Sequence, residues 1–167
     1  GDLDHPASET IIDAAHRDRH LYFNGGQDTS WVVERITLYR GKASGSSWQS
    51  TGGSVRLEND SSPRFKNVIF RDNKDETNQS DGAGAITVSS RALLLLDNCS
   101  FINNSVVSND NSGTGGAIYL NSDPVNKKHL IHGCHFEYNF VSATYNAQGS
   151  ALFIRDATDI INSVFVF

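Results

Sequence analysis

Short apolar runs that alternate with polar residues fill most of this chain. The clearest are four segments in which two apolar residues flank a single residue: Val55/Leu57, Ile86/Val88, Ile118/Leu120 and Leu152/Ile154. Apolar side chains at every second position point to the same face of a strand. Gly, Asn and Ser interrupt the runs before the period of about 3.6 residues that marks a helix can develop. The pattern therefore predicts many short β-strands, each with one face in a core.

Two motifs recur along the chain with a shared period. A Phe-x-x-Asn motif begins at Phe70, Phe101 and Phe136, and the phenylalanine returns at Phe165, at intervals of 31, 35 and 29 residues. A glycine-rich motif of the Gly-Gly-Ala-Ile type occupies 52–55, 83–86, 115–118 and 149–152. Such a period marks a repeat architecture in which each strand stacks on its own copy one turn later. We expect an all-β, right-handed parallel β-helix, a solenoid of about four to five turns.

Three columns of equivalent residues support this stacking. Phe70, Phe101, Phe136 and Phe165 should form a stacked core, together with Cys99 and Cys134, which each lie two residues before a motif phenylalanine. Asparagine side chains tolerate bends and bond to neighbouring backbone, so repeated asparagines predict hydrogen-bonded ladders at corners. One ladder is expected at Asn67, Asn98 and Asn162, with Gly133 in the same column, and a second at Asn73, Asn104 and Asn139. The glycine motifs permit tight corners, which is a structural role.

The two ends of the chain depart from the repeat. Residues 1–33 repeat poorly and predict an N-terminal cap, with a short amphipathic segment at 10–17, followed by an irregular first turn. Residues 34–167 carry the repeats. The final residues Val164, Phe165, Val166 and Phe167 form an apolar strand that we expect to continue into further chain or to stack on another subunit. The chain begins without methionine, which favours a mature secreted segment or a fragment.

Composition narrows the classes of function. A net charge of −5 and a pI near 5.6 argue against a nucleic-acid-binding protein, which usually carries a basic face. No run of 18 apolar residues is present, so no direct membrane span is expected.

The two cysteines fall in adjacent turns, and their pairing stays open at this point. Parallel strands lie about 4.8 Å apart, which exceeds the Cβ separation of roughly 3.8 Å usual in a disulfide. Cys99 and Cys134 are thus either buried stacked thiols or a slightly distorted disulfide. His129, His132 and His135 recur at every third residue. Because this spacing does not place all three on one face of a strand, we interpret them as surface histidines rather than metal ligands.

Two groups of residues are candidates for binding. The acidic segment with Asp72, Asp75, Glu76 and Asp81 is a weak candidate for Ca²⁺, which takes several oxygen ligands; a solvated acidic turn is the alternative, and no cofactor is expected. Tyr119, Phe153 and Arg56 share the outward column of the strands that follow the glycine motifs. Outward aromatic rings can stack on sugars or on another protein, or pack against each other across turns. The loops 42–50, 74–81, 105–113 and 140–148 should emerge from one corner of the solenoid.

The motifs also carry a family resemblance. Gly-Gly-Ala-Ile at 115–118 followed by Phe-Glu-Tyr-Asn at 136–139 resembles the repeats of the polymorphic outer-membrane proteins, which are autotransporter passengers of the chlamydial type. Residues 62–70 and 97–101 are similar to the same family, and the resemblance covers about 34–167. It implies a secreted or surface-exposed β-helix that is often adhesive.

These observations favour a non-enzymatic β-helix, secreted or at the cell surface, that acts in adhesion or as a structural surface element. Its partner would be a protein or glycan on a host or neighbouring cell. One alternative is a filament subunit that self-associates head to tail through its open ends. The other is a carbohydrate-active lyase or hydrolase, for which Arg71 and Asp72 are the nearest arginine–aspartate pair.

Overall fold

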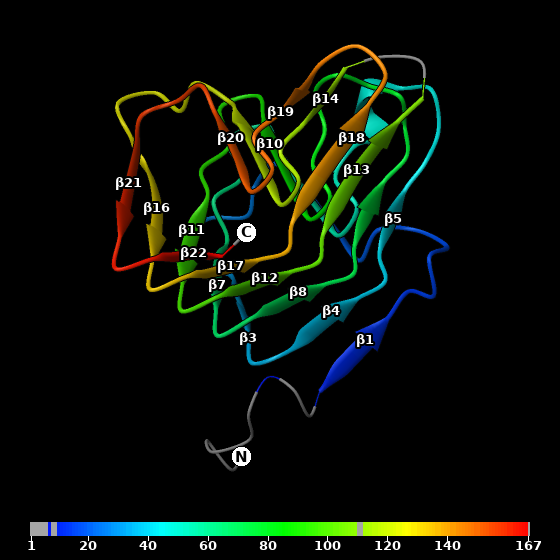
Figure 1. Ribbon diagram of the computed structural model, residues 1–167. Coiled ribbons are helices and arrows are strands. Elements are labelled where there is room, and N and C mark those ends of the chain that lie inside the picture. Colours follow the sequence, from blue (N-terminus) through cyan, green and yellow to red (C-terminus); the bar gives the residue numbers. More distant parts are fainter. Residues whose placement is uncertain (1–6, 8–9, 110–111, 167) are drawn as a thin grey trace.

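The structure is a computed structural model that describes residues 7, 10–109 and 112–166. The chain winds through about four turns of a solenoid whose sheets are all parallel, as Figure 1 shows. The all-β parallel β-helix predicted from the repeats is therefore confirmed. Each full turn, called a rung below, contributes one strand to each of several sheets, so residues about 31 to 35 positions apart lie side by side.

Three long sheets, named A, B and C, form the walls of the solenoid. Sheet A contains β1 (Ile11–Asp13), β4 (Thr37–Tyr39), β8 (Ile69–Arg71), β12 (Ser100–Ile102), β17 (His135–Glu137) and β22 (Val164–Val166). Sheet B contains β2 (Leu21–Asn24), β6 (Val55–Glu58), β10 (Ile86–Ser89), β15 (Ile118–Asn121) and β20 (Leu152–Ile154). Sheet C contains β3 (Val32–Glu34), β7 (Arg64–Lys66), β11 (Leu95–Asp97), β16 (His129–His132) and β21 (Thr158–Ile161).

Two smaller sheets lie between sheets A and B: sheet D, with a strand in each of four rungs, and sheet E, with a strand in each of two. Sheet D contains β5 (Lys42–Ala43), β9 (Lys74–Asp75), β13 (Ser105–Ser108) and β18 (Phe140–Ala143). Sheet E pairs β14 (Gly113–Thr114) with β19 (Ala147–Gln148), and the short 3-10 helix η1 (Trp48–Ser50) lies in an earlier loop. The chain thus passes through sheets A, D, B and C before it returns to sheet A. The segments predicted as loops, 42–50, 74–81, 105–113 and 140–148, each begin with a strand of sheet D, and their other described residues follow that sheet in successive rungs (Figure 1).

The register of the strands follows the two motifs. Ile86 pairs with Val55 on one side and with Ile118 on the other, and Phe101 pairs with Phe70 and Phe136. The four motif phenylalanines form a continuous stack, with ring centroids 4.7–4.8 Å apart and ring planes within 6° of parallel. Offset stacking of this kind adds about 0.5–1.5 kcal/mol per pair beyond the burial of apolar area. The stack therefore fixes the axial alignment of sheet A.

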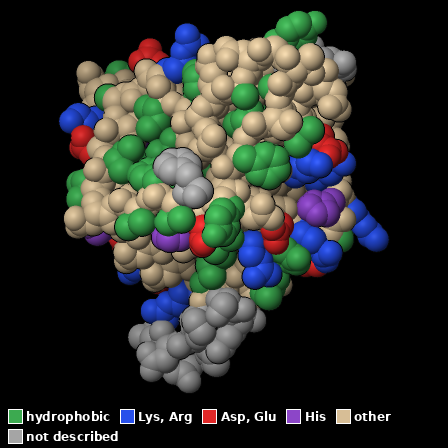
Figure 2. All heavy atoms as spheres, viewed as in Figure 1, with side chains coloured by type: hydrophobic (Ala, Val, Ile, Leu, Met, Phe, Trp, Pro, Cys, Tyr) green, Lys and Arg blue, Asp and Glu red, His purple; other side chains and the backbone are tan. Residues whose placement is uncertain are grey.

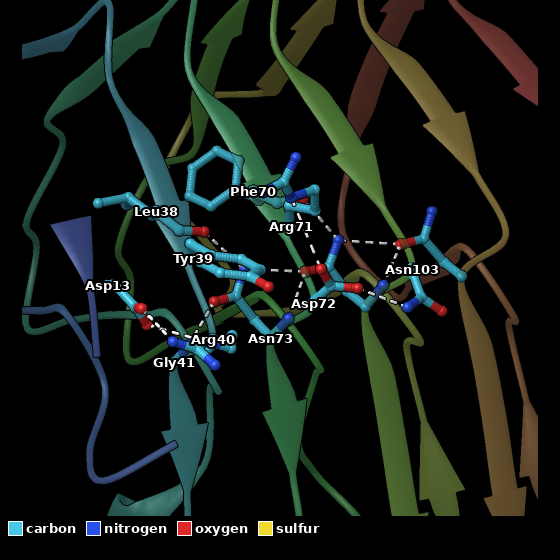
Figure 3. Close-up of polar contacts among 12 residues, drawn as sticks. Asp13, Leu38, Tyr39, Arg40, Gly41, Phe70, Arg71, Asp72, Asn73 and Asn103 are labelled. Carbon is cyan, nitrogen blue, oxygen red and sulfur yellow. Dashed lines mark hydrogen bonds and ion pairs between the residues drawn. The ribbon is translucent and has the colours of Figure 1, made fainter. Parts of the chain in front are cut away.

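The second predicted asparagine ladder is present at the corner between sheets A and D. Asn104 Oδ1 accepts hydrogen bonds from the backbone N–H of Asn73 (3.1 Å) and from its Nδ2 (2.9 Å), and Asn139 Oδ1 does the same for Asn104. Each Nδ2 also donates to a carbonyl oxygen of the rung below, at Leu38, Phe70 and Phe101. Figure 3 shows the first of these contacts, around Asn73. The ladder is buried along its whole length.

Asn67, Asn98 and Asn162 do stack at one corner, but the expectation that their side chains form a hydrogen-bonded ladder is wrong. These residues form the corner between sheets C and A, where their φ angles are 49–52° and that of Gly133 is 61°. Among the described residues, no hydrogen bond links their side chains. The backbone N–H of Asn67 instead donates to the carbonyl of Asp97, and that of Asn98 to the carbonyl of His132. Asparagine is used here because it tolerates the left-handed conformation, which most residues avoid.

The N-terminal segment is more regular than the sequence indicated. Part of the predicted amphipathic cap at 10–17 is the strand β1, which pairs in parallel with β4. The strands β2 and β3 pair with β6 and β7 in the register of the later rungs. Residues 11–34 therefore form a solenoid turn of their own, and the boundary expected at residue 33 does not separate two structures. The repeat was hidden because this turn carries neither motif.

The second glycine of the glycine-rich motif lies where successive rungs approach most closely. A Cβ atom at Gly116 would come within 1.8 Å of the carbonyl oxygen of Ser150 and within 2.8 Å of the backbone nitrogen of Phe140. Both neighbours are backbone atoms, so neither can move without shifting its rung. The equivalent residue of the last rung is Ser150, which is exposed, and no described strand covers it. The structure thus explains why this motif accepts a serine there.

We predict that Gly116→Ala lowers the free energy of unfolding by about 2–3 kcal/mol, because overpacking against backbone costs this much. Ser150→Ala, at the same motif position in the exposed last rung, should change stability by less than about 0.5 kcal/mol. Denaturant unfolding followed by circular dichroism measures both. Equal effects of the two substitutions would contradict the close-approach explanation.

Candidate functional site

The middle of the outward column of sheet B is covered by protein rather than by solvent: Arg56, Thr87 and Tyr119 are buried, whereas Tyr22 at one end is 47% exposed. Arg56 is buried, and its Nε donates to Glu58 Oε2 at 2.9 Å while its terminal nitrogens donate to Thr51 Oγ1 and Ser89 Oγ. The Tyr22 hydroxyl donates to the other carboxylate oxygen of Glu58. An arginine held by this many partners orders the face on which it lies. The expectation that Arg56 belongs to an exposed binding platform is corrected.

Tyr119 and Phe153 also pack against each other. Their rings are parallel, with an interplanar angle of 4° and a centroid separation of 5.3 Å, and Tyr119 is almost fully buried. Burial raises the pKa of Tyr119 to about 12, and the side chain of Asn121 donates to its hydroxyl. Of the two rings, Phe153 alone is partly exposed. The alternative interpretation of cross-turn packing describes this pair, and ligand binding by Phe153 stays a prediction.

A small hollow lies over the middle of this face. It is lined by Arg56, Asp81, Thr87, Ser89, Tyr119 and Asn121, and its volume is about 140 Å³. The hollow arises because Thr87 and Ser89 are short and lie between longer side chains of the neighbouring rungs. Sites for small organic ligands usually measure about 300–1,000 Å³. The hollow is therefore smaller than a usual small-ligand site.

The four acidic residues proposed for Ca²⁺ do not converge. Asp72 accepts a hydrogen bond from Asn103 and lies 3.6 Å from Arg71, as Figure 3 shows. Glu76 pairs with Lys42 and Lys74. Asp75 points to the other side of its strand and is buried. In the part of the chain that the structure describes, no three His, Cys, Asp or Glu side chains form a group that could hold a metal ion. The prediction of a Ca²⁺ site at these four residues is therefore wrong.

The arginine–aspartate pair of the enzyme alternative is part of the same surface network. The Arg71 guanidinium lies over the ring of Tyr39, 4.6 Å from its centroid, and Arg40 lies over that ring from the adjacent corner. Arg40 Nε also donates to Asp13 at 2.9 Å. Figure 3 shows these side chains side by side along the corner of sheet A. Arg71 is thus paired with Asp72 of its own rung, and Arg40 with Asp13 of the adjacent rung.

The interpretation of all three histidines as surface residues is wrong for one of them. His129 is fully buried, whereas His132 and His135 are at the surface as expected. Nδ1 of His129 accepts the backbone N–H of Leu94 at 3.0 Å, so its proton is on Nε2, which faces Ser122 and Asp156. Burial lowers the pKa of His129. Both the serine and the aspartate meet the same ring nitrogen, which differs from a catalytic triad, where they bond opposite nitrogens.

The cysteines are free thiols, which settles the alternative left open by their spacing. Both are buried in adjacent rungs, and burial raises the pKa of Cys99 well above its ordinary value. The Cys99 Sγ lies 3.5 Å from the carbonyl oxygens of Phe65 and Asp97. A protonated, buried thiol behaves as a small apolar side chain. The pair belongs to the stacked core, as predicted.

The apolar segment at the C-terminal end forms β22, the edge strand of sheet A. Val164 and Val166 are exposed, while Phe165 stacks on Phe136; Phe167 lies outside the described residues. Ile160 and Ile161 of β21 are exposed beside them. Figure 2 shows hydrophobic side chains on the face turned to the viewer, where these strands lie in Figure 1. Their role in assembly stays a prediction.

Sequence reasoning missed a set of exposed aromatic residues along β18, named here the aromatic strip. Tyr138 precedes the strand and is 60% exposed, Phe140 begins it and is 43% exposed, and Tyr145 follows it and is 78% exposed. The equivalent residues one rung earlier are polar: Asn103 for Tyr138 and Ser105 for Phe140. Exposed tyrosine and phenylalanine are enriched where proteins meet partners. A change from polar to aromatic within one aligned column was the signal in the sequence.

Burial raises the pKa of Asp75 from its usual 3.8 to about 6, although Thr77 and the backbone of Gly52 donate hydrogen bonds to the carboxylate. An acid that holds its proton more tightly in the folded state stabilises the fold at low pH, and this stabilisation is lost as the pH rises from the unfolded-state pKa through the folded-state pKa. We predict that ionisation of Asp75 lowers the free energy of unfolding by about 2–3 kcal/mol as the pH rises from about 4 to about 6. The difference in unfolding free energy between the parent chain and Asp75→Asn, measured across this range, should show that slope. A difference that is independent of pH would contradict it.

Comparisons with known proteins do not assign the chain to a family. No family model, no curated protein and no solved structure matches the chain. Within the described residues, no helix is long and apolar enough to cross a membrane. The similarity to polymorphic outer-membrane proteins therefore remains a resemblance of short repeat motifs, and functional inference depends on the geometry of the solenoid surface.

Proposed function

We propose that this chain is a non-enzymatic β-helix of a secreted or cell-surface protein that acts in adhesion or as a structural surface element. The observation that carries the proposal is the aromatic strip on the outside of a rigid frame. Tyr138 and Phe140 follow directly from the phenylalanine stack and the buried asparagine ladder. Their backbone is therefore held in place before any partner binds. Preorganised aromatic side chains lose little conformational entropy on binding, which favours affinity.

The loops that follow sheet D extend this candidate surface. Those of the last two rungs are joined by the β14–β19 pairing, and Thr144 Oγ1 donates to the carbonyl oxygen of Asn109 in the rung below. Loops on one face of a rigid solenoid are common recognition surfaces. The proposed partner is a glycan or a protein on a host or neighbouring cell, because tyrosine rings stack on sugars and pack equally well at protein interfaces.

The test replaces Tyr138 and Phe140 by the residues that the fold already accepts one rung earlier, and Tyr145 by a small polar residue. A variant with Tyr138→Asn, Phe140→Ser and Tyr145→Ser should keep its melting temperature and lose at least tenfold in affinity, since aromatic anchors dominate binding energy. Binding is measured on an array that carries glycans and extracellular-matrix proteins. Val125→Ser, at an exposed apolar residue in the turn between β15 and β16, is the matched control. Polysaccharide cleavage above a protein-free blank, lost when residues 71–76 are replaced, would overturn the proposal in favour of an enzyme.

A second candidate is a filament subunit, and the exposed apolar residues of the two end turns favour it. Ile11, Ile12 and Trp31 are exposed in the first turn, and Ile160, Ile161 and Val164 in the last. Contact between unlike ends propagates unless it closes.

If the ends stack, light scattering should show mass that grows with concentration, and negative-stain microscopy should show fibres. Val164→Lys should abolish both, because it places a charge on the edge strand. A parent chain that stays monomeric at millimolar concentration would exclude end-to-end assembly.

A further inference from the structure

The outward face of sheet C carries charges of alternating sign along the solenoid axis. Glu34, Lys66, Asp97 and His132 occupy equivalent positions on the neighbouring strands β3, β7, β11 and β16. Lys66 Nζ lies 4.0 Å from Glu34, and Nδ1 of His132 lies 2.9 Å from Asp97. The side chains are 37%, 49%, 36% and 41% exposed, in that order. This charge column is therefore open to a partner.

A second column on the same face combines apolar side chains with one arginine. Val32, Arg64, Leu95 and Leu130 pair across the same four strands. Between the two columns lies a hollow of about 420 Å³, lined mainly by side chains of both columns and by Thr29. On β7 the outward side chains are long, Arg64 and Lys66, whereas on β11 they are shorter, Leu95 and Asp97. The face thus has a ridge beside a depression.

The order of charges on this face is self-complementary. Read along the axis from β3 to β16, it is negative, positive, negative and, when His132 is protonated, positive, so the reversed order is its opposite at each of these four positions. The fifth strand, β21, continues the column with the uncharged Ile161. Consider a two-fold axis in the interface that runs parallel to the strands, midway between β7 and β11. Rotation about this axis reverses the order of the strands and places β7 of one copy opposite β11 of the other. It would also place the ridge of each copy over the depression of the other. Two-fold contacts of this isologous kind are the commonest in protein assembly.

We propose that the outward face of sheet C binds a second copy of this chain, face to face, with the two solenoid axes antiparallel. Lys66 of each copy then meets Asp97 of the other, and Glu34 meets His132. Val32 meets Leu130 across the interface, and the stem of Arg64 covers Leu95. The contact between Glu34 and His132 is an ion pair when His132 is protonated, because Nδ1 already faces Asp97 of its own chain at 2.9 Å and a neutral ring has only one N–H. This association goes beyond the proposed function and uses a face distinct from the aromatic strip and from the solenoid ends.

The size of the face sets the strength of the contact. Four strands spaced about 4.8 Å apart and three to four residues wide bury less than the roughly 800 Å² per partner of a standard interface. We therefore expect a weak dimer, with a dissociation constant on the order of 10–100 μM at low ionic strength. Salt should weaken it at least fivefold between about 20 and 500 mM, because the exposed charges are screened.

Two single substitutions test the proposal through their mixture. Lys66→Glu places a carboxylate opposite Asp97 of the other copy, and Asp97→Lys places an ammonium group opposite Lys66. Each variant alone should be mainly monomeric in sedimentation velocity at 200 μM, a loss of about a hundredfold in affinity, because one substitution changes both symmetry-related contacts of the dimer. The equimolar mixture should form a heterodimer, because the introduced carboxylate then meets the introduced ammonium group and the unchanged Asp97 meets the unchanged Lys66. Lys127→Glu, at an exposed lysine in the turn between β15 and β16, is the control and should dimerise like the parent chain.

Several outcomes would overturn the proposal. A parent chain that is monomeric at 500 μM and 20 mM salt would do so without reference to any variant. So would variants that fold by circular dichroism but stay monomeric when mixed, or that dimerise separately as well as the parent. Mass that grows beyond a dimer and is abolished by Val164→Lys alone would assign self-association to the ends. Failure of the array experiment, by contrast, would leave the dimer unaffected.

Discussion

The shape of each rung depends on the buried hydrogen bonds of Asn73, Asn104 and Asn139. At the corner between sheets A and D the chain turns, and its backbone N–H and C=O groups would be left without partners inside the protein. Each asparagine satisfies two of them at once, with Oδ1 accepting an N–H and Nδ2 donating to a carbonyl of the rung below. Buried backbone groups without partners cost about 1–3 kcal/mol each. The ladder therefore fixes where these three rungs turn.

The other columns follow from this corner. The motif phenylalanine lies three residues before each asparagine, so the ladder also places the ring that enters the core. Because successive rungs turn at the same point, the rings stack at 4.7–4.8 Å. The second glycine of the other motif then lies against the carbonyl of the next rung, where no side chain fits. The two motifs share one period because both are set by a single helical pitch.

This dependence explains why most of the fold, but little of the surface, could be predicted from the sequence. Buried columns repeat the same residue, as with Phe101 and Asn104, and such columns are visible in one sequence. Surface columns mix unlike residues. The burial of Arg56 was missed because alternation identifies the outward face of a strand, whereas exposure depends on partners such as Glu58 and Thr51 that lie on it. His129 was placed at the surface for the same reason, since its partner Asp156 is 27 residues away.

The charges on sheet C illustrate what only the register can reveal. Glu34, Lys66, Asp97 and His132 are 31 to 35 residues apart, and nothing in their local sequence connects them. Stacking places them about 4.8 Å apart, where like charges in adjacent strands would repel. Alternating signs are therefore a natural solution within one chain. Over the four strands β3, β7, β11 and β16, this alternation gives a column in which reversing the order exchanges the sign at each position. A requirement of intramolecular stacking thus produces a surface that is complementary to its own copy.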